Sequence, residues 1–209
     1  MNTVGIDRAT IQEYVKVAEI LSDYPEISGF ELNISCPNIK EGGIAFGVLP
    51  ESAASVTQAV RRATGRPLIV KLSPNVSRIE PLARAAEEAG ADAISLVNTF
   101  VSLAIDAHTR RPRIGAGFGG LSGPAIKPIA LRLVYEACQA VRIPVIGLGG
   151  IRNGEDAAEF LIAGASAVQV GTATFWDPGA PARIARELDQ YLERENLDRV
   201  KQLVGTLQL

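Results

Sequence analysis

Five short apolar runs, each about as long as a β-strand, alternate along the chain with segments that have helical hydrophobic spacing. The runs are rich in β-branched residues and nearly uninterrupted, which is typical of parallel strands buried on both faces of a sheet. They cover residues 29–34, 68–72, 93–97, 145–148 and 167–170. Because strand and helix alternate throughout, we expect parallel strands joined by right-handed crossovers.

The segments around these strands predict helices. They cover residues 11–22, 51–64, 79–89, 126–141 and 155–163, followed by a C-terminal pair of helices within residues 182–207. Two joints repeat one pattern, since residues 89–94 and 163–168 each place a glycine just after a helix and immediately before a strand. The repetition indicates a single repeating architecture.

Two α/β architectures fit this alternation: an open doubly wound sheet and a (β/α)8 barrel. Polar and glycine residues gather just after the strands, but both architectures place their binding sites there, so the choice stays open. A complete barrel needs about 250 residues, and residues 100–128 form a long excursion rather than a strand–helix unit. The chain is therefore too short for a whole barrel. Without a linker or a break in composition, we expect residues 1–209 to form a single domain.

Residues 103–106 and 112–114 of the excursion predict a small antiparallel hairpin that leads into residues 115–123. The single histidine, His108, falls in this hairpin, where we expect it in solvent rather than in a Ser-His-Asp triad. Residues 115–120 match G-x-G-x-x-G, but they do not join a strand to a helix. A Rossmann nucleotide site is therefore not expected.

The composition excludes several classes of function. The chain is 47% hydrophobic and 21% charged, which is ordinary for a soluble globular protein. With a net charge of -2 and no Lys/Arg cluster, the sequence indicates no basic surface for binding nucleic acid. No apolar run reaches the roughly 18 residues of a membrane span, and charges interrupt residues 1–20, so no signal peptide is expected. These features predict a cytoplasmic protein.

A cysteine lies in the polar loop that follows the first predicted strand. This loop, residues 33–38, contains Asn33, Cys36 and Asn38. A cysteine in such a loop can be a base, a nucleophile, a metal ligand or a small buried residue. The carboxamides favour a functional role, because their paired donor and acceptor match the edge of a pyrimidine or a flavin. No histidine or second cysteine stands at ligand spacing, so a metal is not expected. Cys138 is expected in the core.

Lys71 and two glycine turns are the other candidates. Lys71 interrupts an apolar strand, which fits either a cation facing an anionic cofactor or a side chain that reaches solvent. Gly149 and Gly150 follow one strand, and Gly171 and Thr172 follow the next. Such adjacent strand ends form phosphate cradles in barrels, although tight turns also require glycine.

Taken together, six motifs resemble the dihydroorotate dehydrogenase family, and most closely its class 1B catalytic subunit. They are residues 31–38, 69–75, 95–99, 119–128, 147–150 and 169–172. The resemblance implies a (β/α)8 TIM barrel that is N-terminally incomplete, with about five strands and the end of a sixth. It also implies an FMN-dependent oxidoreductase that converts dihydroorotate to orotate in pyrimidine (UMP) biosynthesis. A partner subunit with FAD and a [2Fe–2S] cluster would pass electrons to NAD+, in a heterotetramer around a homodimer of catalytic subunits.

The resemblance also implies roles for individual residues. Cys36 matches the base that removes the C5 proton while hydride leaves C6 for FMN. Asn33 matches a contact of both FMN and substrate, and Asn98 with Thr99 matches the substrate-binding pair. The matched FMN contacts are Asn33, Lys71, Val97, Gly123, Gly149, Gly150, Gly171 and Thr172. Asn38 matches a further substrate-side asparagine of related branches, and Asn2 a further FMN contact.

The chain lacks the family's first strands, which supply FMN contacts and a substrate-binding lysine. We therefore expect the 209-residue chain alone to bind FMN weakly and to turn over poorly, and the complete protein to be active. Three alternatives remain: an oxidoreductase like dihydropyrimidine dehydrogenase, a class 1A enzyme that uses fumarate, and an inactive barrel fragment that serves as a binding module.

Overall fold

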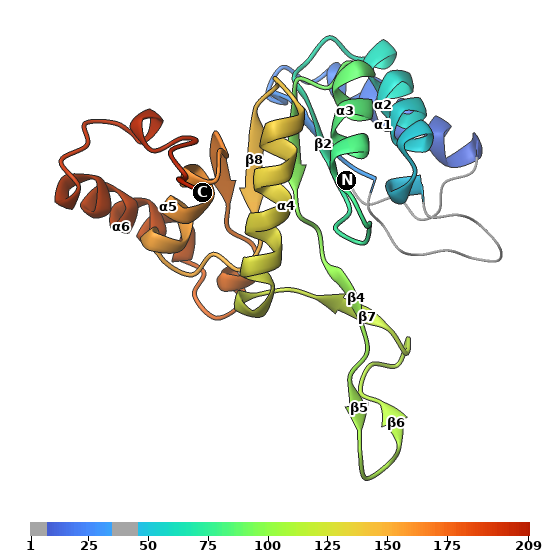
Figure 1. Ribbon diagram of the computed structural model, residues 1–209. Coiled ribbons are helices and arrows are strands. Elements are labelled where there is room, and N and C mark those ends of the chain that lie inside the picture. The colour runs from blue at the N-terminus through green and yellow to red at the C-terminus, as the bar shows by residue number, and fades with distance from the viewer. Residues whose placement is uncertain (1–7, 35–45) are drawn as a thin grey trace.

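The computed structural model describes residues 8–34 and 46–209. At its centre lies a five-stranded parallel sheet (Figure 1). Its strands, in spatial order, are β1 (Phe30–Asn33), β2 (Leu68–Lys71), β3 (Ala93–Leu96), β8 (Val145–Leu148) and β9 (Ala167–Gln169). All five predicted strands are confirmed to within one residue at each end.

The strand order decides between the two architectures that the sequence left open. A doubly wound sheet reverses its strand order at a switch point. Here the order β1-β2-β3-β8-β9 follows the chain in one direction, as in consecutive strands of a barrel. The structure is therefore an incomplete (β/α)8 barrel.

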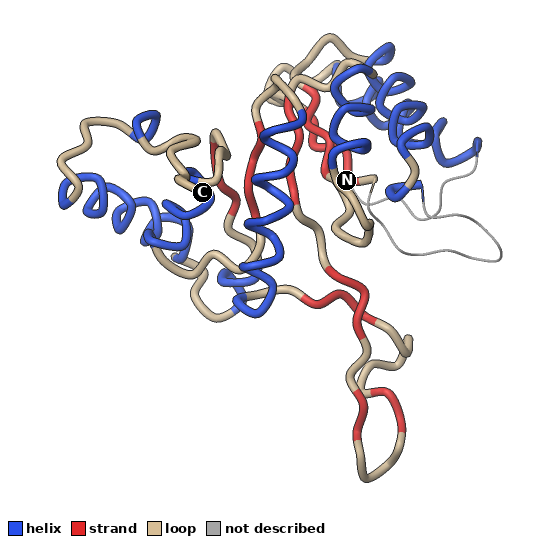
Figure 2. Tube along the Cα trace, in the orientation of Figure 1, coloured by secondary structure: helices blue, strands red, loops and turns tan. Residues whose placement is uncertain are grey.

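Six α-helices lie in the described part of the chain, along one side of the sheet (Figure 2). They are α1 (Arg8–Ser22), α2 (Pro50–Ala63), α3 (Glu80–Glu88), α4 (Lys127–Ala140), α5 (Gly154–Ile162) and α6 (Ala180–Arg194). None of the helices in this part is long and apolar enough to cross a membrane.

The predicted pair of C-terminal helices is wrong in its second member. After α6 the chain forms only a short 3-10 helix, η4 (Val200–Gln202). Two residues with positive φ bracket this segment, Asn196 at 55° and Gly205 at 74°. A residue in the left-handed region interrupts a right-handed helix, so Asn196 ends the run of α6 and Gly205 ends the segment that contains η4.

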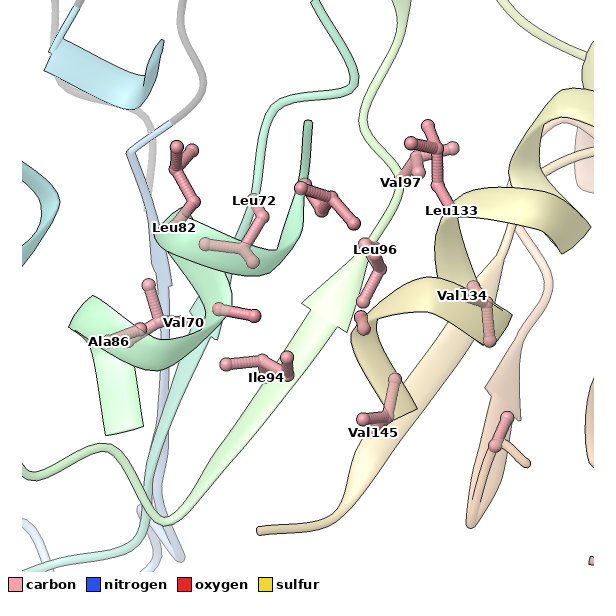
Figure 3. Packing of buried hydrophobic residues seen from close by; sticks show 14 of the residues in the cluster. Val70, Leu72, Leu82, Ala86, Ile94, Leu96, Val97, Leu133, Val134 and Val145 are labelled. Carbon is pink, nitrogen blue, oxygen red and sulfur yellow. The ribbon is translucent and has the colours of Figure 1, made fainter. Parts of the chain in front are cut away.

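The helix-covered, outer face of the sheet carries the hydrophobic core. Its side chains come from alternate strand positions, and each is at most 4% exposed: Leu32, Leu68, Val70, Leu72, Ile94, Leu96 and Val145. From the helices, Leu82 and Ala86 of α3 and Leu133 and Val134 of α4 pack against this layer (Figure 3). Full burial of one such leucine stabilises the fold by about 1.5–3 kcal/mol. Because strand side chains alternate, this packing turns the other set of side chains to the inner face.

The inner face is only partly covered, and it mixes polar side chains with apolar ones such as Ile69, Ile146 and Leu148. It carries Glu31, Lys71, Ser95 and Gln169, and Lys71 is in register with Asn33 on β1 and Ser95 on β3. The expectation that the strands are buried on both faces is correct for β3 but wrong for β1, β2, β8 and β9. The reason is that five strands enclose only part of a barrel interior.

Residues 100–121 form an arm that projects away from the sheet (Figure 1). In it β4 (Phe100–Ser102) pairs with β7 (Gly119–Leu121), and β5 (Ile105–Asp106) pairs with β6 (Arg111–Pro112), both antiparallel. The outer pair confirms the predicted hairpin, and His108 at its tip is exposed. The β4–β7 pair was not predicted, because a strand that begins with two glycines has a turn-like sequence.

Candidate active site

A pocket that is partly open to solvent lies at the carboxyl ends of the strands. We call it the strand-end pocket. Of the ten predicted site residues that the structure describes, nine line it: Lys71, Val97, Asn98, Thr99, Gly123, Gly149, Gly150, Gly171 and Thr172. These residues are far apart in sequence and come together because parallel strands end at the same side of the sheet. Cys36, Asn38 and Asn2 lie outside the described residues.

Asn33 lies beside the strand-end pocket rather than in its wall. It lines an adjoining hollow on the inner face, which shares Lys71 and Asn98 with the pocket. Asn98 Nδ2 donates to Asn33 Oδ1 at 3.1 Å. The buried Tyr14 of α1 donates its hydroxyl to the backbone carbonyl of Asn33 at 2.8 Å. These contacts hold the end of β1 against the pocket.

The backbone at Asn98 and Thr99 is fixed from both sides. Asn98 Oδ1 accepts from the amide of Thr99 at 2.7 Å. Asn75, after β2, donates from Nδ2 to the carbonyl of Thr99 at 3.0 Å and accepts from the amide of Val101 at 2.9 Å. Sequence reasoning gave Asn75 no role, although a carboxamide at the end of a strand was the signal that singled out Asn33 and, in the loop after it, Asn38.

The two glycine turns differ in whether the local geometry requires glycine. Gly149 has φ +131° and Gly150 has φ +83°. A Cβ on Gly150 would lie 2.9 Å from the carbonyl oxygen of Gly123, so a tight turn alone requires glycine there. Gly171 has φ -109°, and a Cβ there would meet nothing within 4 Å. The space beside Gly171 is therefore open, and its backbone in the pocket wall is accessible to a ligand.

Beneath the Gly149–Gly150 turn, three charged side chains join α4 to α5. Lys127 Nζ lies 2.6 Å from Asp156 Oδ1 and 2.7 Å from Glu159 Oε2. Burial by itself would raise the pKa of Asp156, but the hydrogen bonds from Lys127 and from the amide of Arg152 outweigh it and lower that pKa. Because Lys127 packs directly against Gly150, this cluster supports the turn from below.

Lys71 does not reach solvent at a sheet edge, as one interpretation of the sequence required. It lies on β2, between β1 and β3, and its side chain is 20% exposed. Its ammonium lies 3.9 Å from Glu31 Oε2. Glu31 in turn accepts hydrogen bonds from Ser95 and Gln169. This inner network was not predicted, although the signal was present as polar residues inside apolar strands.

Cys138 is partly buried and packs against the core, as predicted. Burial raises the pKa of its thiol to about 11, so it stays protonated at neutral pH. A protonated thiol away from the pocket is neither a nucleophile nor a base.

A family model described as dihydroorotate dehydrogenase matches residues 2–192. The chain belongs to the dihydroorotate dehydrogenase family. A protein of Geobacter metallireducens named "Dihydroorotate dehydrogenase B (NAD(+)), catalytic subunit" is 56% identical over 96% of this chain and 66% of its own length. A protein of Bacteroides thetaiotaomicron with the same name is 52% identical over 99% of this chain and 68% of its own.

The name of a third relative specifies a different electron acceptor. It is a Solibacter usitatus protein, provisionally named dihydroorotate dehydrogenase A (fumarate), which is 70% identical over 94% of this chain and 64% of its own length. The chain thus spans about two thirds of the length of the curated relatives it matches. Family membership confirms the recognition made from the six motifs and accounts for the incomplete barrel.

The strand-end pocket suits the FMN that this family uses. It combines a lysine on one wall with glycine backbone at the ends of β8 and β9. Its hydroxyl pair, Thr172 Oγ1 donating to Ser122 Oγ at 2.8 Å, lies beside the glycine turns and adds groups that can bind phosphate.

Proposed function

We propose that this protein oxidises dihydroorotate to orotate with FMN held in the strand-end pocket. One observation carries the proposal: in a member of this family, Lys71, the Asn98–Thr99 pair and the glycine turns meet in one pocket. Because the chain spans about two thirds of its relatives, the activity is proposed for the whole protein.

The residues that would hold FMN divide into two groups. Lys71 would lie against the ring system, where a cation stabilises the negative charge of the reduced form. The backbone at Gly149, Gly150 and Gly171, with the hydroxyl of Thr172, would bind the phosphate. Val97 and Gly123 would complete the walls. When bound, FMN supplies a two-electron acceptor for the hydride that leaves C6 of the substrate.

The carboxamides would bind the pyrimidine ring. Asn98 is fixed at both ends, since its Nδ2 donates to Asn33 and its Oδ1 accepts from Thr99. A carboxamide held in one orientation presents a defined edge, which selects a ring with matching amide and carbonyl groups. Thr99 lines the same wall of the pocket and would contact the substrate beside Asn98.

Cys36 would remove the C5 proton as a thiolate base. This role rests on the resemblance of residues 31–38 to the family's loop, in which Cys36 follows Asn33 by three positions. General-base catalysis by cysteine requires that the thiolate be populated near working pH and that water be excluded.

Two electron acceptors are candidates. The relatives named as NAD(+) catalytic subunits favour NAD+. In that case, a partner subunit with FAD and a [2Fe–2S] cluster would pass the electrons to NAD+, and two catalytic subunits would form a homodimer. The name of the Solibacter relative favours fumarate. The names agree on the substrate and differ on the acceptor.

Orotate formation by the purified whole protein tests the proposal. We expect oxidation of dihydroorotate with one of the two acceptors, and no oxidation of dihydrouracil, which lacks the carboxylate. Fumarate alone would support turnover in a class 1A enzyme, whereas NAD+ would do so only with the electron-transfer subunit. Flavin retained without oxidation of dihydroorotate by any acceptor would refute the proposed substrate. The 209-residue chain, assayed in parallel, is expected to retain less FMN than the whole protein.

A further inference from the structure

Glu31 is the carboxylate that faces Lys71 on the inner side of the sheet. Glu31 projects from β1 and Lys71 from β2, and their register pairs Glu31 with Ile69 and Lys71 with Asn33. The contact between Glu31 Oε2 and Lys71 Nζ, at 3.9 Å, therefore runs diagonally between neighbouring strands. Lys71 also lines the strand-end pocket, so its ammonium has the pocket on one side and a carboxylate on another.

The position of Glu31 is fixed by two neutral donors from more distant strands. Ser95 of β3, which is fully buried, donates its hydroxyl to Glu31 Oε1 at 2.6 Å. Gln169 of β9 donates its Nε2 to the same oxygen at 3.0 Å. Both donors are neutral, so they orient the carboxylate without an opposite charge of their own. One oxygen is thus held in place, and the other makes the contact with Lys71.

We propose that Glu31 is a positioning residue for Lys71: it holds the ammonium at the pocket wall and balances its charge. This rests on the proposed function, in which Lys71 faces the flavin ring. A lysine ammonium that is largely removed from water needs an opposite charge. Oxidised flavin is neutral, so Glu31 supplies that charge, and it competes for Lys71 when the ring becomes anionic. Glu31 therefore limits how strongly Lys71 favours the reduced cofactor.

The ion pair can be tested without flavin. We would measure the acylation rate of Lys71 by mass spectrometry in the flavin-free protein, comparing the wild type with Glu31→Gln. Glutamine keeps the acceptor for Ser95 but removes the charge. We expect Lys71 to react about threefold faster in the variant, as for loss of a partly exposed ion pair. Lys127, whose contacts with Asp156 and Glu159 stay intact, serves as internal reference. Equal rates for Lys71 would overturn the pairing.

The consequence for the cofactor is read from the midpoint potential of the whole protein with FMN bound. Glu31→Gln should raise the affinity for reduced over oxidised FMN about tenfold, which is about 30 mV for a two-electron couple. Ser95→Ala, which only loosens the carboxylate, should give a smaller shift in the same direction. Glu136→Gln, which removes the same charge from an exposed pair with Arg132 on α4, should give none.

A Lys71→Met background separates positioning from simple electrostatics. If Glu31 acts through Lys71, Glu31→Gln should no longer shift the potential in that background. An equal shift in both backgrounds, or weaker binding of both redox forms without any shift, would overturn the proposal. If the wild type binds no FMN, the proposed function fails, and the acylation rates still decide whether Glu31 holds Lys71.

Discussion

Replacing Gly150 by alanine is expected to destabilise the fold strongly, whereas the same change at Gly171 is not. Gly150 has φ +83°, a conformation that costs an L-residue about 1–2 kcal/mol. Its new Cβ would also lie 2.9 Å from both the carbonyl oxygen of Gly123 and Cβ of Lys127, which makes overpacking worth a further ~1–3 kcal/mol. Together these terms lower the free energy of unfolding by about 2–5 kcal/mol.

Gly171 is the matched control for this prediction. It has a negative φ and open space around its Cβ position, so alanine there should change the free energy of unfolding by less than about 0.5 kcal/mol. Urea titration of both variants without flavin measures the difference directly. For a protein of this size, Gly150→Ala should also lower the melting temperature by about 4–20 °C. Equal midpoints for Gly150→Ala and the wild type would refute the steric reasoning, as would an equal loss in both variants.

Three further predictions address the pocket and its supports. Gly171→Ala should weaken FMN binding about tenfold by filling the open space at the pocket wall, and unchanged affinity in a fluorescence titration would remove Gly171 from the site. Asn75→Ala should raise KM for dihydroorotate, because Thr99 loses its clamp; an unchanged KM would contradict this. Asp156 has a lowered pKa, so its contribution to stability is complete at neutral pH and is lost as pH falls below about 4. Asp156→Asn should lower the free energy of unfolding by about 3 kcal/mol at pH 7 and weaken its dependence on pH in the acid range. An acid pH dependence as steep as that of the wild type would contradict the assignment.

Much of the fold was predictable because each strand of the sheet forms an apolar run in the sequence. Leu68, Val70 and Leu72 are buried under the helices, and the polar residues between them are few, so the strand is visible as an apolar run. The arm was only partly predictable, since the Gly119–Gly120 start of β7 resembles a turn. A close approach explains that choice: a Cβ on Gly120 would overlap the Thr99 side chain.

The strand-end pocket was predictable for a similar reason, because loops after parallel strands meet at one side of the sheet. Gly149 and Gly171, for example, could be assigned to one site without knowledge of any contact. The network around Glu31 could not be predicted in that way. It depends on the register of β1 with β2 and on the curvature that brings Gln169 of β9 within 3.0 Å of Glu31 on β1. Neither quantity is encoded in a local pattern.

The most direct test of the central claim is anaerobic addition of dihydroorotate to the whole protein loaded with FMN. If the strand-end pocket holds the flavin beside the carboxamides of Asn33 and Asn98, the visible flavin absorbance should bleach with one equivalent of dihydroorotate, and orotate should appear in equal amount. Flavin that stays oxidised in the presence of excess dihydroorotate would contradict the claim.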